Sequence, residues 1–293
     1  MAIRFLMAII AVFGCAALIP TAQAQMTTVP TTAVSGPVTL HGAGATFPAP
    51  LYRKWIEVYT KANPTIAIEY QEIGSGEGIK QFLENTIDFG ASDSALSDEQ
   101  IQQAPTGATL IPATAGAIVL AYNLPNLKGT LKLSREVYTD IFIGKIREWN
   151  DPRIQALNPD LLLPKQTIIL VTRQDSSGTT YALTNHLSAI SAEWRNQGPG
   201  VGKMVNWPSV SMTARGNEGV AGRIQRSWGS IGYVEYGFAK RLGLPMIHLR
   251  NKAGVFVEPN LDSSQAALAA NASQIPGNLR IFLPDPDGND SYP

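Results

Sequence analysis

Cysteine is almost absent from this chain, and histidine is scarce. The 293 residues include a single cysteine, Cys15, and three histidines, at positions 41, 186 and 248. One thiol cannot close an internal disulfide, and the three histidines lack the spacing of a metal site. The sequence therefore predicts no disulfide framework, no bound metal and no cofactor.

An excess of charge of either sign is also missing. Basic and acidic residues number 23 each, so neither nucleic acid nor an acidic membrane surface is indicated as a partner. Hydrophobic residues make up 44% of the chain and charged residues 16%, which is ordinary for a globular protein. The 26 glycines and 20 prolines predict many turns and short elements, as in α/β folds. The length favours two lobes or one large domain.

Residues 1–24 have the pattern of a signal peptide. Arg4 supplies the positive start, residues 5–18 form an apolar stretch too short to span a bilayer comfortably, and Ala22-Gln23-Ala24 fits an A-x-A cleavage site. An alternative interpretation makes Cys15 a lipid-anchoring residue. Both interpretations predict an exported protein.

A cluster of polar residues between positions 171 and 181 indicates an anion site. The apolar run 167–171 ends in Arg173, Asp175 and several hydroxyls around one glycine, and a helical pattern follows. A strand, a glycine loop and a helix start together present N–H groups and a helix dipole to a small anion, and an arginine adds a bidentate fork. The alternative is that Ser177 or Thr179 only caps the helix and that Arg173 lies at the surface.

The same order of strand, small polar loop and helix start occurs twice nearer the N-terminus. Residues 38–40 lead into small residues before Thr46 and Phe47, and residues 66–70 lead into a glycine-rich loop around Ser75. A further short strand ends in the carboxylate of Asp93. Each loop alone is weak evidence, and the first does not fit the G-x-G-x-x-G pattern of dinucleotide sites.

Packing and connections can also be predicted. The helix that starts near Pro48 is expected to bury an apolar stripe made of Leu51, Trp55, Val58 and Tyr59. Residues 109–122 are expected to form a strand, a crossing point near Gly116 and a second strand in another lobe. Residues 279–283 are expected to form a strand that returns toward the first lobe.

Several segments, taken with their spacing, resemble one family. The matching segments are Gly42–Pro50, Ile73–Gly76, Asp88–Asp93 and Ser177–Thr179, with supporting matches at Ile143–Ile146 and Ile231–Tyr236. Between about residues 40 and 236 the chain therefore resembles the phosphate-binding protein of the bacterial high-affinity phosphate ABC transporter.

The resemblance implies an α/β fold of the type II periplasmic binding proteins. It implies two lobes, each with a mixed sheet, and a ligand cleft between them. After a flexible leader at 25–37, lobe I would comprise 38–114 plus 275–293, and lobe II would comprise 115–274. Relative to the family the chain is short at its C-terminus, so we expect the first lobe to be incomplete and some of its apolar surface to be uncovered.

The resemblance also implies a function and a set of ligand contacts. A monomer would bind inorganic phosphate in the periplasm, without catalysis, and deliver it to an inner-membrane ABC permease. Asp175 would hold Arg173 in place, and ionised Asp93 would accept the proton that phosphate carries and sulfate lacks. The implied phosphate contacts are Thr46, Phe47 (backbone N–H), Ser75, Asp93, Arg173, Ser177, Gly178 (backbone N–H) and Thr179.

A second class of function is an alternative to phosphate delivery. A phosphoester hydrolase or a surface anion-binding protein could use the same lobes. A hydrolase needs a positioned nucleophile and base, or metals, and the sequence shows neither. His186 lies on the same predicted helix as Ser177 but does not face back to its start.

Lobe closure is expected to bend the chain near residues 111–116 and 270–276.

Overall fold

The computed structural model describes residues 36–207, 211–274, 276–277 and 280–293. Within it, Pro37–Pro293 form one compact unit. The expected signal peptide at 1–24, Cys15 and nearly all of the expected leader at 25–37 lie outside the described residues. None of the described helices combines the length and the apolar character needed to cross a bilayer.

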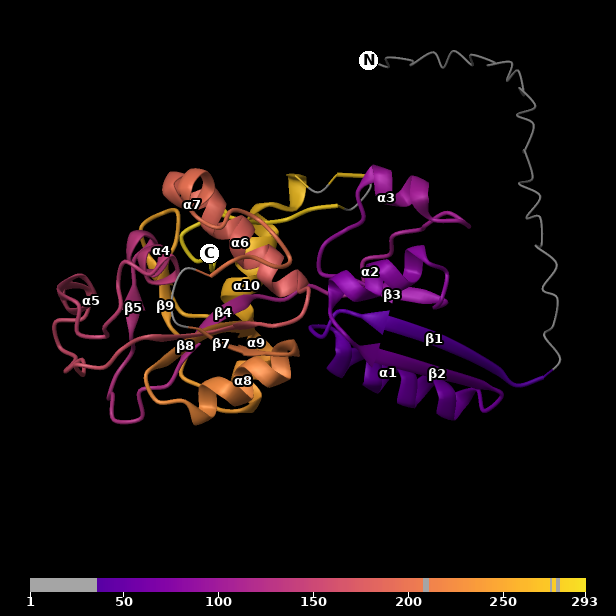
Figure 1. Cartoon of the computed structure of the whole chain (residues 1–293), viewed down its shortest axis with the longest axis horizontal. Coiled ribbons are helices and arrows are strands. Elements are labelled where there is room, and N and C mark those ends of the chain that lie inside the picture. The colour runs from indigo at the N-terminus through magenta and orange to yellow at the C-terminus, as the bar shows by residue number, and fades with distance from the viewer. Residues whose placement is uncertain (1–35, 208–210, 275, 278–279) are drawn as a thin grey trace, which may run out of the picture. The chain divides into compact units, whose positions relative to one another are not determined.

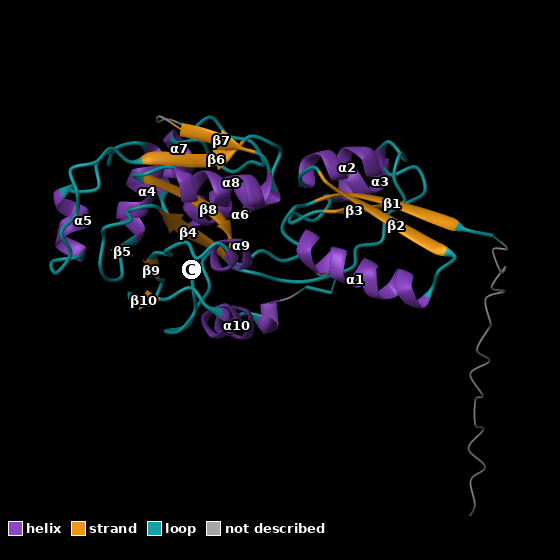
Figure 2. Cartoon of the chain, turned by 90° about the horizontal axis from the view of Figure 1, so that it is seen from below, coloured by secondary structure: helices purple, strands orange, loops and turns teal. Residues whose placement is uncertain are grey.

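The first sheet has three parallel strands with helices on both faces (Figure 1). Its chain order alternates strand and helix, so each parallel connection passes through a helix, as parallel pairing requires. Helices α1 and α2 lie on opposite faces of this sheet in both views (Figures 1 and 2). The elements of this part are β1 (Val38–Gly44), α1 (Ala49–Ala62), β2 (Ile66–Glu72), α2 (Ser75–Leu83), β3 (Phe89–Ala91) and α3 (Asp98–Gln103).

The second sheet has four strands in the order β4-β8-β6-β7, and only the β4–β8 pair is antiparallel. Its strands are β4 (Ile118–Tyr122), β6 (Ile169–Arg173), β7 (Ser211–Ala214) and β8 (Ser230–Glu235). A small third sheet joins β5 (Lys132–Leu133), β9 (His248–Arg250) and β10 (Phe256–Val257). The prediction of a mixed sheet therefore holds for the second sheet, whereas the described strands of the first sheet are all parallel.

Helices surround the second sheet, and the main hydrophobic core lies there. Trp149, Trp194 and Tyr233 are fully buried in this core. Burying one large apolar side chain stabilises a fold by about 1.5–3 kcal/mol, so this half carries most of the packing energy. The helices are α4 (Arg135–Ile143), α5 (Pro152–Leu157), α6 (Gly178–Ile190), α7 (Ala192–Gln197), α8 (Gly216–Arg226), α9 (Tyr236–Arg241), α10 (Leu261–Ala270) and the 3₁₀ turn η1 (Ala272–Gln274).

The last residues of the chain pack against this second half. The Arg135 guanidinium makes a two-point ion pair with Asp285, at 2.6 and 2.7 Å. The Asn251 amide donates to backbone carbonyls of residues 288, 289 and 291, and Tyr292 is buried in the main core. These contacts join residues 285–292 to the segment 115–274.

Three local predictions were wrong. Helix α1 does not bury its stripe, since Trp55, Val58 and Tyr59 are each about half exposed. These side chains lie on one face, as their spacing predicts, but no described element covers that face.

Residues 109–117 are not a strand, and their backbone pairs with no described strand. Pro112 lacks an N–H group, which disfavours pairing there. Residues 280–283 are likewise outside any helix or strand.

Candidate anion-binding site

Arg173 ends β6 and is held rigidly below the surface. Its Nε donates to Asp175 Oδ1 at 2.8 Å and its Nη2 donates to Asp175 Oδ2. Its Nη1 donates to Thr179 Oγ1 at 3.3 Å, and its backbone N–H donates to the Tyr233 hydroxyl at 3.1 Å. A guanidinium has five N–H donors, so with three engaged two remain for a ligand. The alternative that Arg173 is a surface residue is excluded, because its side chain is 2% exposed.

Asp175 orients Arg173 and stays charged. Burial opposes its ionisation, but the hydrogen bonds and the positive charge of Arg173 outweigh burial and hold the pKa of Asp175 below its usual value. The backbone N–H of Gly216 adds a hydrogen bond at 3.0 Å. These bonds place Asp175 where it could support Arg173, and that role stays a prediction.

The start of α6 lies against residues of the first half. Ser177 caps the helix, with its hydroxyl accepting from the Thr180 N–H at 3.1 Å, so the capping interpretation applies to this residue. Gly178 follows, and a β-carbon there would lie 2.5 Å from both Asp93 Cβ and Ser75 Oγ. Only glycine permits this approach, which brings the positive end of the helix to Asp93 and Ser75.

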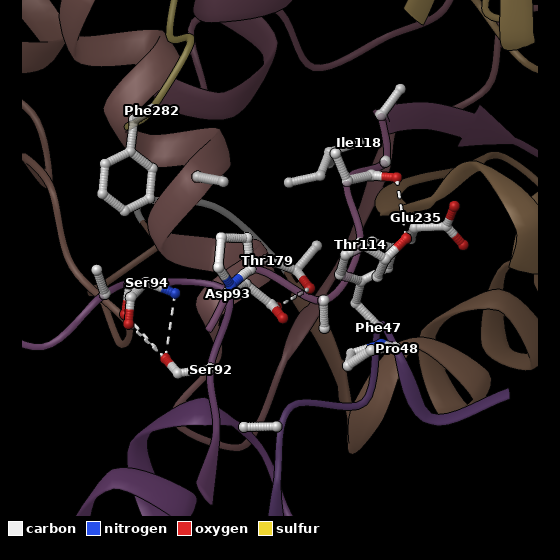
Figure 3. Close-up of a pocket in the computed structure, with 18 of the residues that line it drawn as sticks. Phe47, Pro48, Ser92, Asp93, Ser94, Thr114, Ile118, Thr179, Glu235 and Phe282 are labelled. Atoms are coloured by element: carbon white, nitrogen blue, oxygen red, sulfur yellow. Dashed lines mark hydrogen bonds between the residues drawn. The ribbon is translucent and has the colours of Figure 1, made fainter. Parts of the chain in front are cut away.

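The first half contributes hydroxyls and one carboxylate. Ser75 begins α2 and is buried, and its hydroxyl accepts from the Asp93 backbone N–H at 3.2 Å. The Asp93 carboxylate accepts from the Thr179 hydroxyl at 3.4 Å (Figure 3). Thr46 is buried where the chain leaves β1. These residues lie at the carboxyl ends of parallel strands, where α/β sheets place their ligands.

Hydrogen bonds connect the two halves at this point. The Gly76 N–H donates to the Ser176 carbonyl at 3.0 Å, and Asn217 donates twice to Thr46 Oγ1, at 3.1 and 3.0 Å. The predicted residues that the structure brings together are Thr46, Ser75, Asp93, Arg173, Asp175, Gly178 and Thr179. Binding by each of them stays a prediction.

The electrostatic balance of the site is set by one arginine and three carboxylates. The pKa of Asp93 is raised to about 6: burial is the main cause, Arg173 and the Thr179 hydroxyl oppose the rise, and the charges of Glu235 and Asp175 add to it. Burial also raises the pKa of Glu235. Asp93 is therefore mostly ionised at neutral pH and takes up a proton as the pH falls through about 6.

A large cavity of about 1640 Å³ adjoins this site, and Asp93, Thr179 and Glu235 are among its lining residues (Figure 3). Phe47 lies at the same cavity, with its ring against Gly116. Much of the remaining wall is apolar and includes the exposed face of α1. Of the predicted anion contacts, Phe47, Asp93 and Thr179 are among the lining residues, so the polar cluster meets this mainly hydrophobic space at those residues. In the described part of the chain no three His, Cys, Asp or Glu side chains gather in a way that could hold a metal.

Two residues of this site were not predicted. Asn217 bridges Thr46 and Thr179, and Tyr233 holds the Arg173 backbone. The sequence does contain a signal for Asn217, because the order of strand, glycine and helix start appears again at residues 211–226. Tyr233 alternates within a buried strand, and nothing in the sequence distinguishes it from a core residue.

Comparison with known proteins places the chain in a family. Residues 24–293 match the PBP superfamily domain. The phosphate-binding protein PstS of Haemophilus influenzae is 45% identical over 253 residues, covering 86% of this chain and 74% of that protein. The PstS of Pasteurella multocida is 44% identical over 256 residues, which cover 87% of this chain and 73% of that protein.

Solved structures agree in fold. A phosphate-binding protein from Stenotrophomonas maltophilia has a TM-score of 0.66 at 23% identity, covering 87% of this chain and 76% of that one. The high-affinity periplasmic phosphate-binding protein PfluDING, bound with phosphate, has a TM-score of 0.67 at 20% identity. The match covers 87% of this chain and 77% of that one. These likenesses confirm the predicted type II periplasmic binding protein fold. The chain belongs to the PBP superfamily and, within it, to the family of the PstS phosphate-binding proteins.

Proposed function

We propose that this protein binds inorganic phosphate at the polar cluster described above. The observation that carries the proposal is the buried Arg173, which keeps two N–H donors for a ligand beside the hydroxyls of Thr46, Ser75 and Thr179. Charge-assisted bonds from a guanidinium, together with hydroxyl and helix N-terminal donors, match a small tetrahedral oxyanion. The names of the relatives support the same ligand.

Asp93 is the proposed selectivity residue. Phosphate near neutral pH carries a proton and can donate one hydrogen bond, whereas sulfate has only acceptors. An ionised Asp93 accepts the phosphate hydrogen but repels sulfate. A buried charged group left without a partner costs about 1–3 kcal/mol or more, which gives strong discrimination.

The wider role follows from the family. We place the protein in the periplasm as a monomer that delivers phosphate to an inner-membrane ABC permease. In this proposal lobe I comprises residues 38–114 plus 275–293 and lobe II comprises residues 115–274, and the lobes close by bending near residues 111–116 and 270–276. Ser177, Gly178 and Phe47 would add their donors to the bound anion when the lobes are together.

The proposal is tested by titrating the protein with phosphate and with sulfate at pH 8 in a calorimeter. We expect phosphate to bind with a dissociation constant of about 1 μM or lower, which is about −8 kcal/mol, and sulfate to bind at least 100-fold more weakly. Equal affinities for the two anions, or no heat of binding with phosphate, would contradict the proposed phosphate binding.

A parallel phosphatase assay addresses the hydrolase alternative. We expect no turnover, because His186 bonds to Tyr138 and to the Pro284 carbonyl instead of facing Ser177.

Selectivity should depend on pH. Because the pKa of Asp93 is raised to about 6, its ionised fraction falls as the pH falls through 6, and the protonated form can donate to sulfate. Lowering the pH from 8 to 5 should therefore reduce the ratio of phosphate to sulfate affinity by about tenfold or more. Competition titrations across this range measure the ratio. A ratio that stays constant from pH 8 to pH 5 would show that Asp93 does not read the ligand proton.

A further inference from the structure

Asn217 uses every polar atom of its side chain within the site. It is the second residue of α8 and is fully buried. Its Nδ2 donates to Thr46 Oγ1 at 3.0 Å and to Thr179 Oγ1 at 3.3 Å, and its Oδ1 accepts from the Glu235 backbone N–H at 3.0 Å. Because a backbone N–H can only donate, the atom that faces Glu235 is the amide oxygen, and the NH₂ group must face the two threonines.

This arrangement fixes the direction of two hydroxyl groups. A hydroxyl has two acceptor positions and one donor hydrogen. Thr46 Oγ1 accepts from both the backbone N–H and the Nδ2 of Asn217, so toward any other group Thr46 can only donate. Thr179 Oγ1 accepts from Asn217 and from Arg173, so its hydrogen is likewise left for Asp93 or for a ligand.

We infer that Asn217 is a positioning residue for anion binding, which keeps Thr46 and Thr179 as hydrogen-bond donors. The inference rests on the proposed phosphate function. A free hydroxyl rotor can turn a lone pair toward a phosphate oxygen, which is repulsive, and it loses rotational freedom when it binds. With both acceptor positions filled, each hydroxyl can only donate: the Thr179 hydrogen is directed to Asp93 in this structure, and the Thr46 hydrogen is left for an oxyanion.

The backbone just before Asn217 is held in place by its own conformation and by a hydrogen bond. Gly216, immediately before it, has a φ of +65°, a conformation that favours glycine, and its N–H donates to Asp175 Oδ1 at 3.0 Å. The carboxylate that orients Arg173 therefore also sets the start of α8. One carboxylate and one amide together orient an arginine and two hydroxyls.

The test exchanges the amide for a carboxylate of the same shape. In Asn217→Asp an acceptor oxygen replaces the NH₂ group, so Thr46 and Thr179 have to donate to residue 217 instead of to the anion. Phosphate binding, measured by calorimetry at pH 8, should weaken by about 100-fold. Asn158→Asp is the matched control, because Asn158 is also buried and bonds through Oδ1 to one backbone N–H and through Nδ2 to two oxygens, far from the site. This control should bind phosphate within about twofold of the wild type.

A double-mutant cycle separates positioning from a merely structural role. Asn217→Ala should weaken phosphate binding by about tenfold in the wild-type background but by only about threefold when Thr46 is already valine, because one of the hydroxyls it orients is then missing. Purely additive effects would overturn the positioning role, as would wild-type affinity in Asn217→Asp. If the wild type and Asn158→Asp both fail to bind phosphate, the proposed function fails together with this inference.

Discussion

Replacing Arg173 by alanine is expected to weaken phosphate binding by about 1000-fold, which is about 4 kcal/mol. The guanidinium is the only described cation with its charged group buried among the site hydroxyls, and it keeps two N–H donors beyond those bonded to Asp175 and Thr179. Its loss removes charge-assisted bonds and leaves Asp93 and Asp175 facing the anion without compensation. Calorimetric titration with phosphate measures the effect.

The Arg173 experiment needs two companion variants. Alanine at 173 leaves Asp175 buried without its partner, and a stranded buried charge costs several kcal/mol of stability. Arg173→Met combined with Asp175→Asn removes both charges and keeps the protein folded for the same titration, and it should show the same loss of binding. Arg135→Ala removes another two-point ion pair, with Asp285, outside the site, and should leave the phosphate affinity within about twofold. Phosphate binding unchanged in Arg173→Ala would show that the assigned site is wrong.

Asp93→Asn is expected to change which anion the protein prefers more than how tightly it binds phosphate. An asparagine amide can donate to sulfate, whereas the ionised carboxylate repels it. The ratio of phosphate to sulfate affinity should fall by about 100-fold, while phosphate affinity itself changes by less than tenfold. The part of the pH dependence that comes from the Asp93 carboxyl, whose pKa is about 6, should also disappear.

A nearby carboxylate supplies the control for Asp93. Asp88 lies just before β3 and accepts from the His41 backbone N–H at 2.7 Å, and it makes no contact with Arg173 or Thr179. Asp88→Asn should leave the selectivity as in the wild type. If Asp93→Asn still rejects sulfate as strongly as the wild type does, discrimination must come from the donors and not from this carboxylate.

The sequence predicted the site better than it predicted the packing around it. Glycines and hydroxyls after strands indicated three loops, and the family resemblance, not the loops alone, implied that Ser75, Asp93 and Arg173 belong to one site. The order of strand, glycine and helix start at residues 211–226 indicates where Asn217 lies in its loop, but not that it bonds to Thr46, 171 positions away. No local pattern reports a contact of that separation.

Packing was harder to predict because periodicity identifies an apolar face but not what covers it. The spacing of Trp55, Val58 and Tyr59 indicates one face of a helix, and these residues do share a face, yet they remain half exposed. Composition misled in a similar way at residues 109–117, where an apolar stretch suggested a strand that has no pairing partner. Both cases depend on long-range neighbours.

Gly178 has a consequence for how related chains are compared. Its α-carbon lies so close to Asp93 and Ser75 that a single added methyl group would need space that those atoms occupy. A relative with alanine or serine aligned at this position has to hold Asp93 and Ser75 further from the start of this helix. The residue aligned with Gly178 in a homologous sequence therefore indicates whether the same close approach of the two loops is sterically possible there.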